Sequence, residues 1–162
     1  MAKKETMQRV SISEKRIGLE TSMVVNQLTD NCLYSGFFGR LDSARMKTIT
    51  DGILDAMEQT TNDTIVVDLA NVDIIDSAVA AHLIRTGDVI KLIGCHVIFC
   101  GINTRVAQTM VTVGVEFSKY HVCKDLKAAL KLVFELHGLA LVPVTKIPVH
   151  GGKTPALETP II

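Results

Sequence analysis

Two short segments place an aspartate directly before a serine where a helical pattern begins. Asp42-Ser43 lies within residues 39–45, and Asp76-Ser77 lies within residues 72–81. An aspartate or serine at a helix start accepts a hydrogen bond from a free backbone N–H and contributes about 0.5–2 kcal/mol relative to alanine. Capping is the simplest explanation of both pairs. It needs only one such residue per helix, so it does not explain why a second hydroxyl is present at each start.

A functional interpretation is that Ser77 and Ser43 accept phosphate. A phosphoserine carries about −1.5 to −2 charges at pH 7. The helix N-terminus partly offsets that charge, whereas the adjacent aspartate repels it. Phosphorylation would then change a docking surface more than the core, which lets a domain without catalysis act as a switch. The candidate partner-binding residues around the two serines are Asp42, Asp73, Asp76, His82 and Arg85.

Other chemistry has little support in the sequence. The phosphate loop G-x-x-x-x-G-K-[ST], the dinucleotide fingerprint G-x-G-x-x-G and the nucleophile elbow G-x-S-x-G do not occur. The four cysteines form no C-x-x-C pair, and no two histidines have the i, i+4 spacing of a helical metal site. We therefore expect no enzyme activity, no metal and no cofactor. One alternative stays open, in which His82 and Arg85 line a small-molecule site at the strand ends.

Periodicity alternates between strands and helices. Residues 65–69 and 96–100 are short and apolar on both faces, as buried strands are, and residues 120–123 predict a third strand. Residues 23–28 and 32–38 flank a polar turn and predict a hairpin.

Four helical stripes follow Asp42, Ser77, Asn103 and Asp125, and the last three end at a glycine. The residues predicted to face inward are Met46, Ile49, Ile53, Met57, Ala80, Leu83, Ile84, Ile90, Ile93, Val106, Met110, Val113, Leu126, Leu130, Val133 and Phe134. The order β-β-α-β-α-β-α-β-α predicts one α/β domain with a mixed sheet and helices packed on it.

Length and charge set the remaining bounds. The 162 residues correspond to one domain, and 17 basic against 17 acidic residues give zero formal net charge, which argues against nucleic-acid binding. No apolar run approaches the roughly 20 residues of a membrane span, and the N-terminus lacks the apolar region of a signal peptide. A cytoplasmic location is expected. All four prolines lie in the last twenty residues. We predict a polar tail over 1–22, the domain over 23–140 and a proline-containing tail over 141–162.

Residues 65–116, IVVDLANVDIIDSAVAAHLIRTGDVIKLIGCHVIFCGINTRVAQTMVTVGVE, resemble the STAS family of sulphate-transporter and anti-sigma-factor-antagonist domains. Strand, Asp-Ser loop, helix, strand, the helix G-I-x-x-x-V-A-Q-T and a G-V turn occur in the family's order. The resemblance covers residues 23–138 and is greatest to bacterial stressosome scaffold proteins of the RsbS and RsbR types.

The resemblance implies a non-catalytic scaffold that binds and sequesters a serine/threonine switch kinase and is reset by a cognate phosphatase. It also implies assembly with other STAS proteins into a large homo- or hetero-oligomer. Ser77 matches the phosphorylated residue of the family's D-[ST] loop, and Ser43, within LDSAR, matches the additional site of RsbR-type proteins. The short N-terminus is like RsbS-type proteins, whereas LDSAR is like the RsbR type. A simple antagonist that binds an anti-sigma kinase remains an alternative.

Overall fold

The computed structural model describes residues 23–141, so the predicted N-terminal tail and all but Leu141 of the predicted C-terminal tail lie outside the described residues. The elements follow the predicted order along the chain. They are β1 (Met23–Thr29), β2 (Cys32–Gly39), α1 (Ser43–Glu58), β3 (Thr64–Val72), α2 (Ser77–Leu92), β4 (His96–Cys100), α3 (Thr104–Thr112), β5 (His121–Cys123) and α4 (Leu126–Leu136). The prediction of an α/β fold with a mixed sheet is confirmed.

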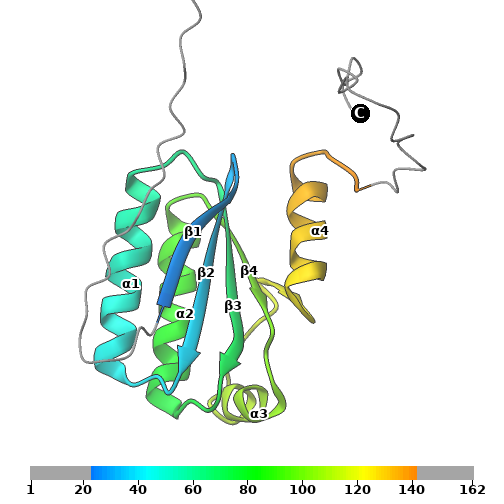
Figure 1. The fold of residues 1–162 in the computed structure, drawn as a ribbon. Helices are drawn as coiled ribbons and strands as arrows, with labels where there is room; N and C mark the ends of the chain where they lie inside the picture. The colour runs from blue at the N-terminus through cyan, green and yellow to red at the C-terminus, as the bar shows by residue number, and fades with distance from the viewer. Residues whose placement is uncertain (1–22, 142–162) are drawn as a thin grey trace, which may run out of the picture.

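The five strands form one sheet in the order β1-β2-β3-β4-β5. β1 and β2 pair antiparallel across the polar turn, and every later strand pairs parallel with its predecessor. Parallel pairing requires a crossover connection, and the helices between β2 and β5 supply it. The carboxyl ends of β2, β3 and β4 therefore lie along one edge of the sheet, at the bottom of Figure 1.

Helices cover the two sheet faces unequally. α1 and α2 pack side by side on one face, α4 lies on the other, and α3 lies beyond the carboxyl ends of the strands (Figure 1). The larger core cluster joins α1, α2 and α3 to one side of the sheet, including Ile65 and Val67 of β3. A smaller cluster joins Ala129 and Val133 of α4 to the other side, including Val66. β3 is thus buried on both faces, as its apolar run predicts.

The prediction of an inward-facing side chain is wrong for two residues. Ile93 is 56% exposed, because it is the C-cap of α2 and the chain turns back at Gly94, whose φ is +91°. Leu126 is 37% exposed, because α4 buries only Ala129 and Val133 fully against the sheet. All four residues predicted to face inward from α1 are buried. Among residues 23–141, none of the helices is long and apolar enough to cross a membrane.

Candidate functional site

The two Asp-Ser segments lie at the same edge of the sheet. β2 and β3 are neighbouring parallel strands whose ends pair through Gly39 and Val72, and the loops to α1 and α2 leave from this point. A backbone hydrogen bond of 3.3 Å from the Asp73 N–H to the Gly39 carbonyl joins the loops directly. The fold therefore places two segments that are far apart in sequence on one surface.

Each aspartate is an N-cap. An Oδ1 atom of Asp42 accepts a hydrogen bond from the Arg45 N–H at 2.8 Å, and that of Asp76 accepts one from the Val79 N–H at 2.8 Å. Capping thus explains both aspartates and leaves the serine hydroxyls unassigned. Ser43 and Ser77 are the first residues of α1 and α2, and both are exposed. Both serines thus lie at the surface of the folded domain.

Arg45 is the charged residue that contacts the loop before Ser43. Arg45 Nη1 donates a hydrogen bond of 2.8 Å to the Arg40 carbonyl, and Arg45 Nε lies 3.7 Å from Asp42 Oδ2. The guanidinium therefore folds back over the loop that precedes α1. A negative group added to Ser43 would be attached next to a capping aspartate that already has an arginine as its ion-pair partner.

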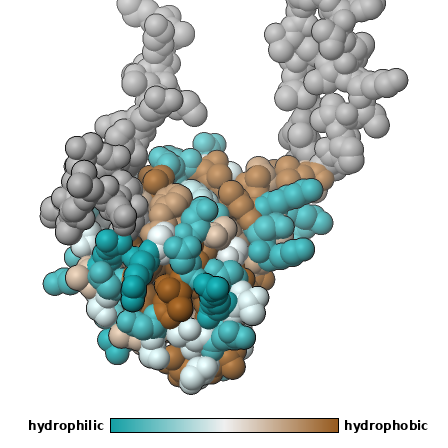
Figure 2. Space-filling view, turned by 60° about the horizontal axis from the view of Figure 1, so that its bottom comes forward, coloured by the Kyte–Doolittle hydropathy of each residue, from teal (hydrophilic) through white to brown (hydrophobic). Residues whose placement is uncertain are grey.

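Different side chains surround Ser77. Asp73, Ile74 and Asp76 precede it and are exposed, with Ile74 47% exposed. Val79, at the position that matches Arg45, is fully buried. Figure 2 brings this edge forward and shows an apolar spot bordered by hydrophilic side chains. An apolar residue next to carboxylates and a hydroxyl is a surface suited to contact with another protein.

His82 and Arg85 lie further along α2. His82 is half-buried, and its carbonyl accepts a hydrogen bond of 3.0 Å from the Thr86 hydroxyl, whereas Arg85 is exposed. Neither residue lines the shallow depression between the β3–α2 loop and the start of α3. That depression is formed by Ala70, Val72, Asp73, Asn103, Thr104 and Arg105. The structure thus places His82 and Arg85 on the same helix as Ser77 but outside this depression.

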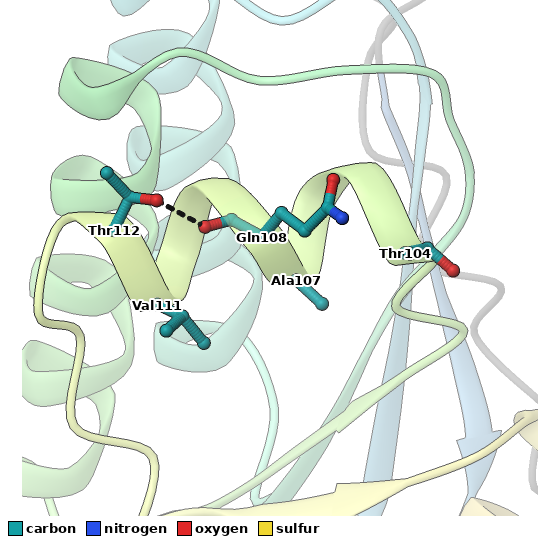
Figure 3. Close-up of a pocket in the computed structure, with 5 residues that line it drawn as sticks. All are labelled: Thr104, Ala107, Gln108, Val111 and Thr112. Atoms are coloured by element: carbon teal, nitrogen blue, oxygen red, sulfur yellow. Dashed lines mark hydrogen bonds between the residues drawn. The ribbon is translucent and has the colours of Figure 1, made fainter.

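α3 presents an uncharged outer face beside this edge. Thr104, Ala107, Gln108 and Val111 line a second shallow depression with Thr112, whose hydroxyl donates a hydrogen bond of 2.9 Å to the Gln108 carbonyl (Figure 3). Val111 is the most exposed apolar residue of this helix. Both depressions are shallow and open, so this edge resembles a docking surface more than an enclosed ligand site.

The sequence did not reveal the side-chain hydrogen bonds that fix the loops and strands near this edge. Asn103 caps α3 and also donates an Nδ2 hydrogen bond of 2.7 Å to the Val72 carbonyl. Asp68, buried in the middle of β3, accepts hydrogen bonds from the Tyr34 hydroxyl at 3.1 Å and the Ala70 N–H at 2.9 Å. Burial and the Asp68 charge raise the pKa of Tyr34 to about 12, so the phenol stays a donor. An aspartate within the otherwise apolar run of residues 65–69 was the available signal.

The described residues offer little for metal or thiol chemistry. No group of three or more His, Cys, Asp or Glu side chains between residues 23 and 141 is arranged to hold a metal ion. Burial raises the pKa of Cys32 and of Cys100 to about 12, so both remain thiols rather than reactive thiolates at neutral pH.

The fold and this edge agree with the family comparison. Residues 23–129 match the STAS domain, so the chain belongs to the STAS family. Among known proteins it is similar to the RsbT co-antagonist protein RsbRA of Bacillus subtilis, with 24% identity over 127 residues, which are 78% of this chain and 46% of RsbRA. The chain spans less than half the length of the RsbR co-antagonists that it resembles.

Two solved structures share the fold. RsbS S58E of Moorella thermoacetica has a TM-score of 0.64 at 18% identity, and the match covers 72% of this chain and 98% of that one. A chain from the structure of the stressosome, described as a signal integration and transduction hub, has a TM-score of 0.58 at 18% identity. That match covers 70% of this chain and 98% of the stressosome chain.

Proposed function

We propose that this protein is a non-catalytic signalling scaffold of the cytoplasm. It binds and sequesters a serine/threonine switch kinase, releases it when phosphorylated on Ser77, and is reset by a cognate phosphatase. Ser43 modulates this switch. Assembly with other STAS proteins gives a large homo- or hetero-oligomer, and the likeness of the fold to a chain from the stressosome structure supports this part of the proposal.

The exposure of Ser77 supports the proposal more than any other observation. Its hydroxyl is at the first position of α2, the cap is supplied by Asp76, and an apolar residue, Ile74, is exposed beside it. A phosphate there would add about −1.5 to −2 charges next to the carboxylates of Asp73 and Asp76. A partner that contacts Ile74 in the unmodified protein would then meet strong local repulsion. Asp42, Asp73, Asp76, His82 and Arg85 are the proposed contacts around the two serines.

Phosphosite mapping by mass spectrometry tests the switch. The full chain is purified from its own stressed and unstressed cells, and the phosphate on Ser77 is quantified. We expect occupancy that rises with stress. Absence of phosphate from Ser77 under every condition contradicts the proposed switch and leaves a STAS domain whose regulation lies elsewhere.

Co-purification tests the partner. Tagged wild-type protein, Ser77→Ala and Ser77→Asp are recovered from the same cells, and the serine/threonine kinase in each sample is quantified. We expect strong recovery with Ser77→Ala and weak recovery with Ser77→Asp. Ser118→Asp is the matched control, since Ser118 is exposed and hydrogen-bonded to Glu116 in a different loop. Equal kinase recovery by all forms contradicts the proposal.

Particle size separates a scaffold from a simple anti-sigma-factor antagonist. A scaffold elutes with its STAS partners as a very large particle, whereas a simple antagonist elutes as a small complex with its kinase. Light scattering on the eluted complex gives the mass. If a metabolite co-purifies and no kinase does, the alternative of a small-molecule-binding domain or enzyme is supported.

A further inference from the structure

The last residues of β3 extend beyond the strand that pairs with it on one side. The pairing of β3 with β4 ends at Asp68 and Cys100, whereas the pairing of β3 with β2 continues to Val72. Val72 is buried, and a buried backbone carbonyl needs a hydrogen-bond donor. Asn103 supplies this donor where the β4 ladder has ended, since its Nδ2 atom lies 2.7 Å from the Val72 carbonyl oxygen.

The chain after β4 turns so that Asn103 reaches this carbonyl. Gly101 has a φ of +69°, and a Cβ atom there would lie 2.6 Å from Asp68 Oδ1 and 2.7 Å from the Ala70 nitrogen. These distances exclude a side chain, so the turn passes directly against β3. Two residues later Asn103 is the N-cap of α3, and its Oδ1 atom accepts a hydrogen bond of 3.0 Å from the Val106 N–H. One side chain thus caps a helix and binds the end of a strand.

The peptide group between Val72 and Asp73 is held at both of its polar atoms. Its carbonyl accepts the hydrogen bond from Asn103, and its N–H donates the hydrogen bond of 3.3 Å to the Gly39 carbonyl. A trans peptide group is planar with its N–H and C=O on opposite sides, so these two bonds fix its orientation. This group is the first of the loop that leads to Ser77.

The loop between this peptide group and Ser77 is fixed at its other end as well. Ile75 is buried, and Asp76 accepts the hydrogen bond that caps α2. Ile74, which lies between the two fixed ends, is exposed. The orientation of the peptide group before Asp73 therefore determines where Ile74 and Ser77 lie at the surface.

We propose that Asn103 is a positioning residue for the loop that carries Ile74 and Ser77. Its Nδ2 donor fixes the entry of the loop, and because the same side chain caps α3, the loop and α3 keep one relative position. Toward the kinase this inference rests on the proposed function, in which the partner binds a surface that Asn103 has already ordered. The position of the loop does not depend on that function.

Asparagine suits this role because its side chain has both a donor and an acceptor. Asn103→Asp separates the two contacts, since aspartate caps a helix about as well as asparagine but its carboxylate cannot donate to the Val72 carbonyl. Asn103→Ser is a second variant, which also caps but adds no charge and ends one bond short of Nδ2. Asp125→Ala is the matched control for a general loss of stability, because it removes the same kind of cap from α4 on the other face of the sheet.

Hydrogen exchange of single amides in the full chain, followed by NMR, tests the positioning. We expect the Asp73 amide to exchange at least about tenfold faster in Asn103→Asp and Asn103→Ser, since its hydrogen bond to Gly39 depends on a fixed peptide group. The Val106 amide should stay protected in both variants, because the cap is retained. Unchanged exchange of Asp73 in Asn103→Asp, or a similar increase in Asp125→Ala, overturns the proposal.

Co-purification from cells separates this proposal from the proposed function. We expect Asn103→Asp to lower kinase recovery at least about threefold and Asp125→Ala to leave it unchanged, since only the first disturbs the ordered loop. Equal recovery by the wild type and Asn103→Asp overturns the role of Asn103 toward the kinase. A wild type that recovers no kinase, together with the expected response of the Asp73 amide, contradicts the proposed function and leaves the positioning of the loop by Asn103 standing.

Discussion

The starts of α1 and α2 share the sequence Asp-Ser-Ala after an apolar residue and differ in the residues at either end of this shared segment. Residues 40–45 read Arg-Leu-Asp-Ser-Ala-Arg, and residues 74–79 read Ile-Ile-Asp-Ser-Ala-Val. The residue before each capping aspartate is buried, Leu41 in one case and Ile75 in the other, which fixes the entry of the chain into the helix. The flanking positions are arginines at α1 and apolar residues at α2.

The two helix starts have the same capping hydrogen bond but differ in the charge of the side chains around the serine. At α1 the Arg45 guanidinium lies against Asp42 and the Arg40 carbonyl, so a phosphate on Ser43 would be partly neutralised by its own protein. At α2 the charged groups beside Ser77 are the carboxylates of Asp73 and Asp76. A phosphate on Ser77 would present its charge to a partner, whereas one on Ser43 would adjust the local surface.

The largest expected effect compares the two phosphate-mimicking variants. We expect Ser77→Asp to lower kinase recovery at least about tenfold and Ser43→Asp to lower it about two- to threefold, because only the second is neutralised locally. Quantitative co-purification from the same cells measures both. Equal losses from the two variants would show that the arginines at α1 do not shield the added charge.

Removal of each capping aspartate tests whether the cap stabilises α1 and α2 equally. We expect Asp76→Ala and Asp42→Ala each to lower the free energy of unfolding by about 1 kcal/mol, with the larger loss at Asp76. The hydrogen bond from the Val79 N–H to Asp76 is partly buried. The hydrogen bond from the Arg45 N–H to Asp42 is exposed, so water can replace the aspartate there. Urea denaturation measures both variants.

Asparagine is the control, because it caps about as well as aspartate. Asp76→Asn should retain most of the stability that Asp76→Ala loses. A larger loss at Asp42 than at Asp76 would reverse the ranking inferred from burial.

The arginine at α1 can be tested through its coupling to Ser43. In a double-mutant cycle of Ser43→Glu with Arg45→Gln, we expect a favourable coupling of about 0.2–1 kcal/mol, typical of an exposed ion pair. The coupling should decrease at high salt, since the charges are exposed. Denaturation of the four proteins at low and high salt measures it. A coupling near zero at low salt would separate Arg45 from any role at Ser43.

The smallest effect concerns His137, at the opposite edge of the sheet. His137 Nε2 lies 2.8 Å from Asp63 Oδ1, and its Nδ1 lies 2.8 Å from the Val133 carbonyl. The hydrogen bond with Asp63 raises the pKa of His137, and the same bond lowers the pKa of Asp63. The contact thus stabilises α4 fully below the ordinary histidine pKa of about 6.5 and loses this effect as pH rises through the folded pKa.

At the acid end, the contribution of Asp63 is present above its ordinary pKa of about 3.9 and is lost as pH falls through the lowered value. Hydrogen exchange of the α4 amides, corrected for the intrinsic rate, should show less protection at about pH 8 than at about pH 6. His137→Gln should remove the difference, and His121→Gln should leave it. A pH dependence that persists in His137→Gln would assign it to another group.

Most of the fold could be predicted from the sequence because the order of strands and helices along the chain follows from local patterns. The apolar run of β3, the polar turn after β1 and the glycines that end α2, α3 and α4 all act over a few residues. The exposure of Ile93 and Leu126 could not be predicted, since periodicity shows which residues share a helix face but not how far the sheet beneath it extends.

The site was partly predictable for the same reason. The Asp-Ser pairs are visible as helix starts, but their meeting at one edge depends on the pairing of β2 with β3. The bond from Asn103 to the Val72 carbonyl joins residues that are 31 positions apart, so no local pattern reveals it. Long-range contacts of this kind are set by the completed sheet.

The helices that begin at Ser43 and Ser77 also meet through a pair of hydroxyls. The Oγ1 atoms of Thr50 and Thr86 lie 2.7 Å apart, and each also lies within hydrogen-bond distance of a carbonyl one turn back, at Met46 and His82. Two hydroxyls have two hydrogens for these three contacts, so one contact lacks a proton at any moment. When one threonine hydroxyl donates its hydrogen to the other, it no longer donates to the carbonyl of its own helix. The orientations of the Thr50 and Thr86 hydroxyl hydrogens are therefore correlated. Valine at both positions would keep the shape of the contact and remove this correlation, leaving packing alone to hold α1 against α2.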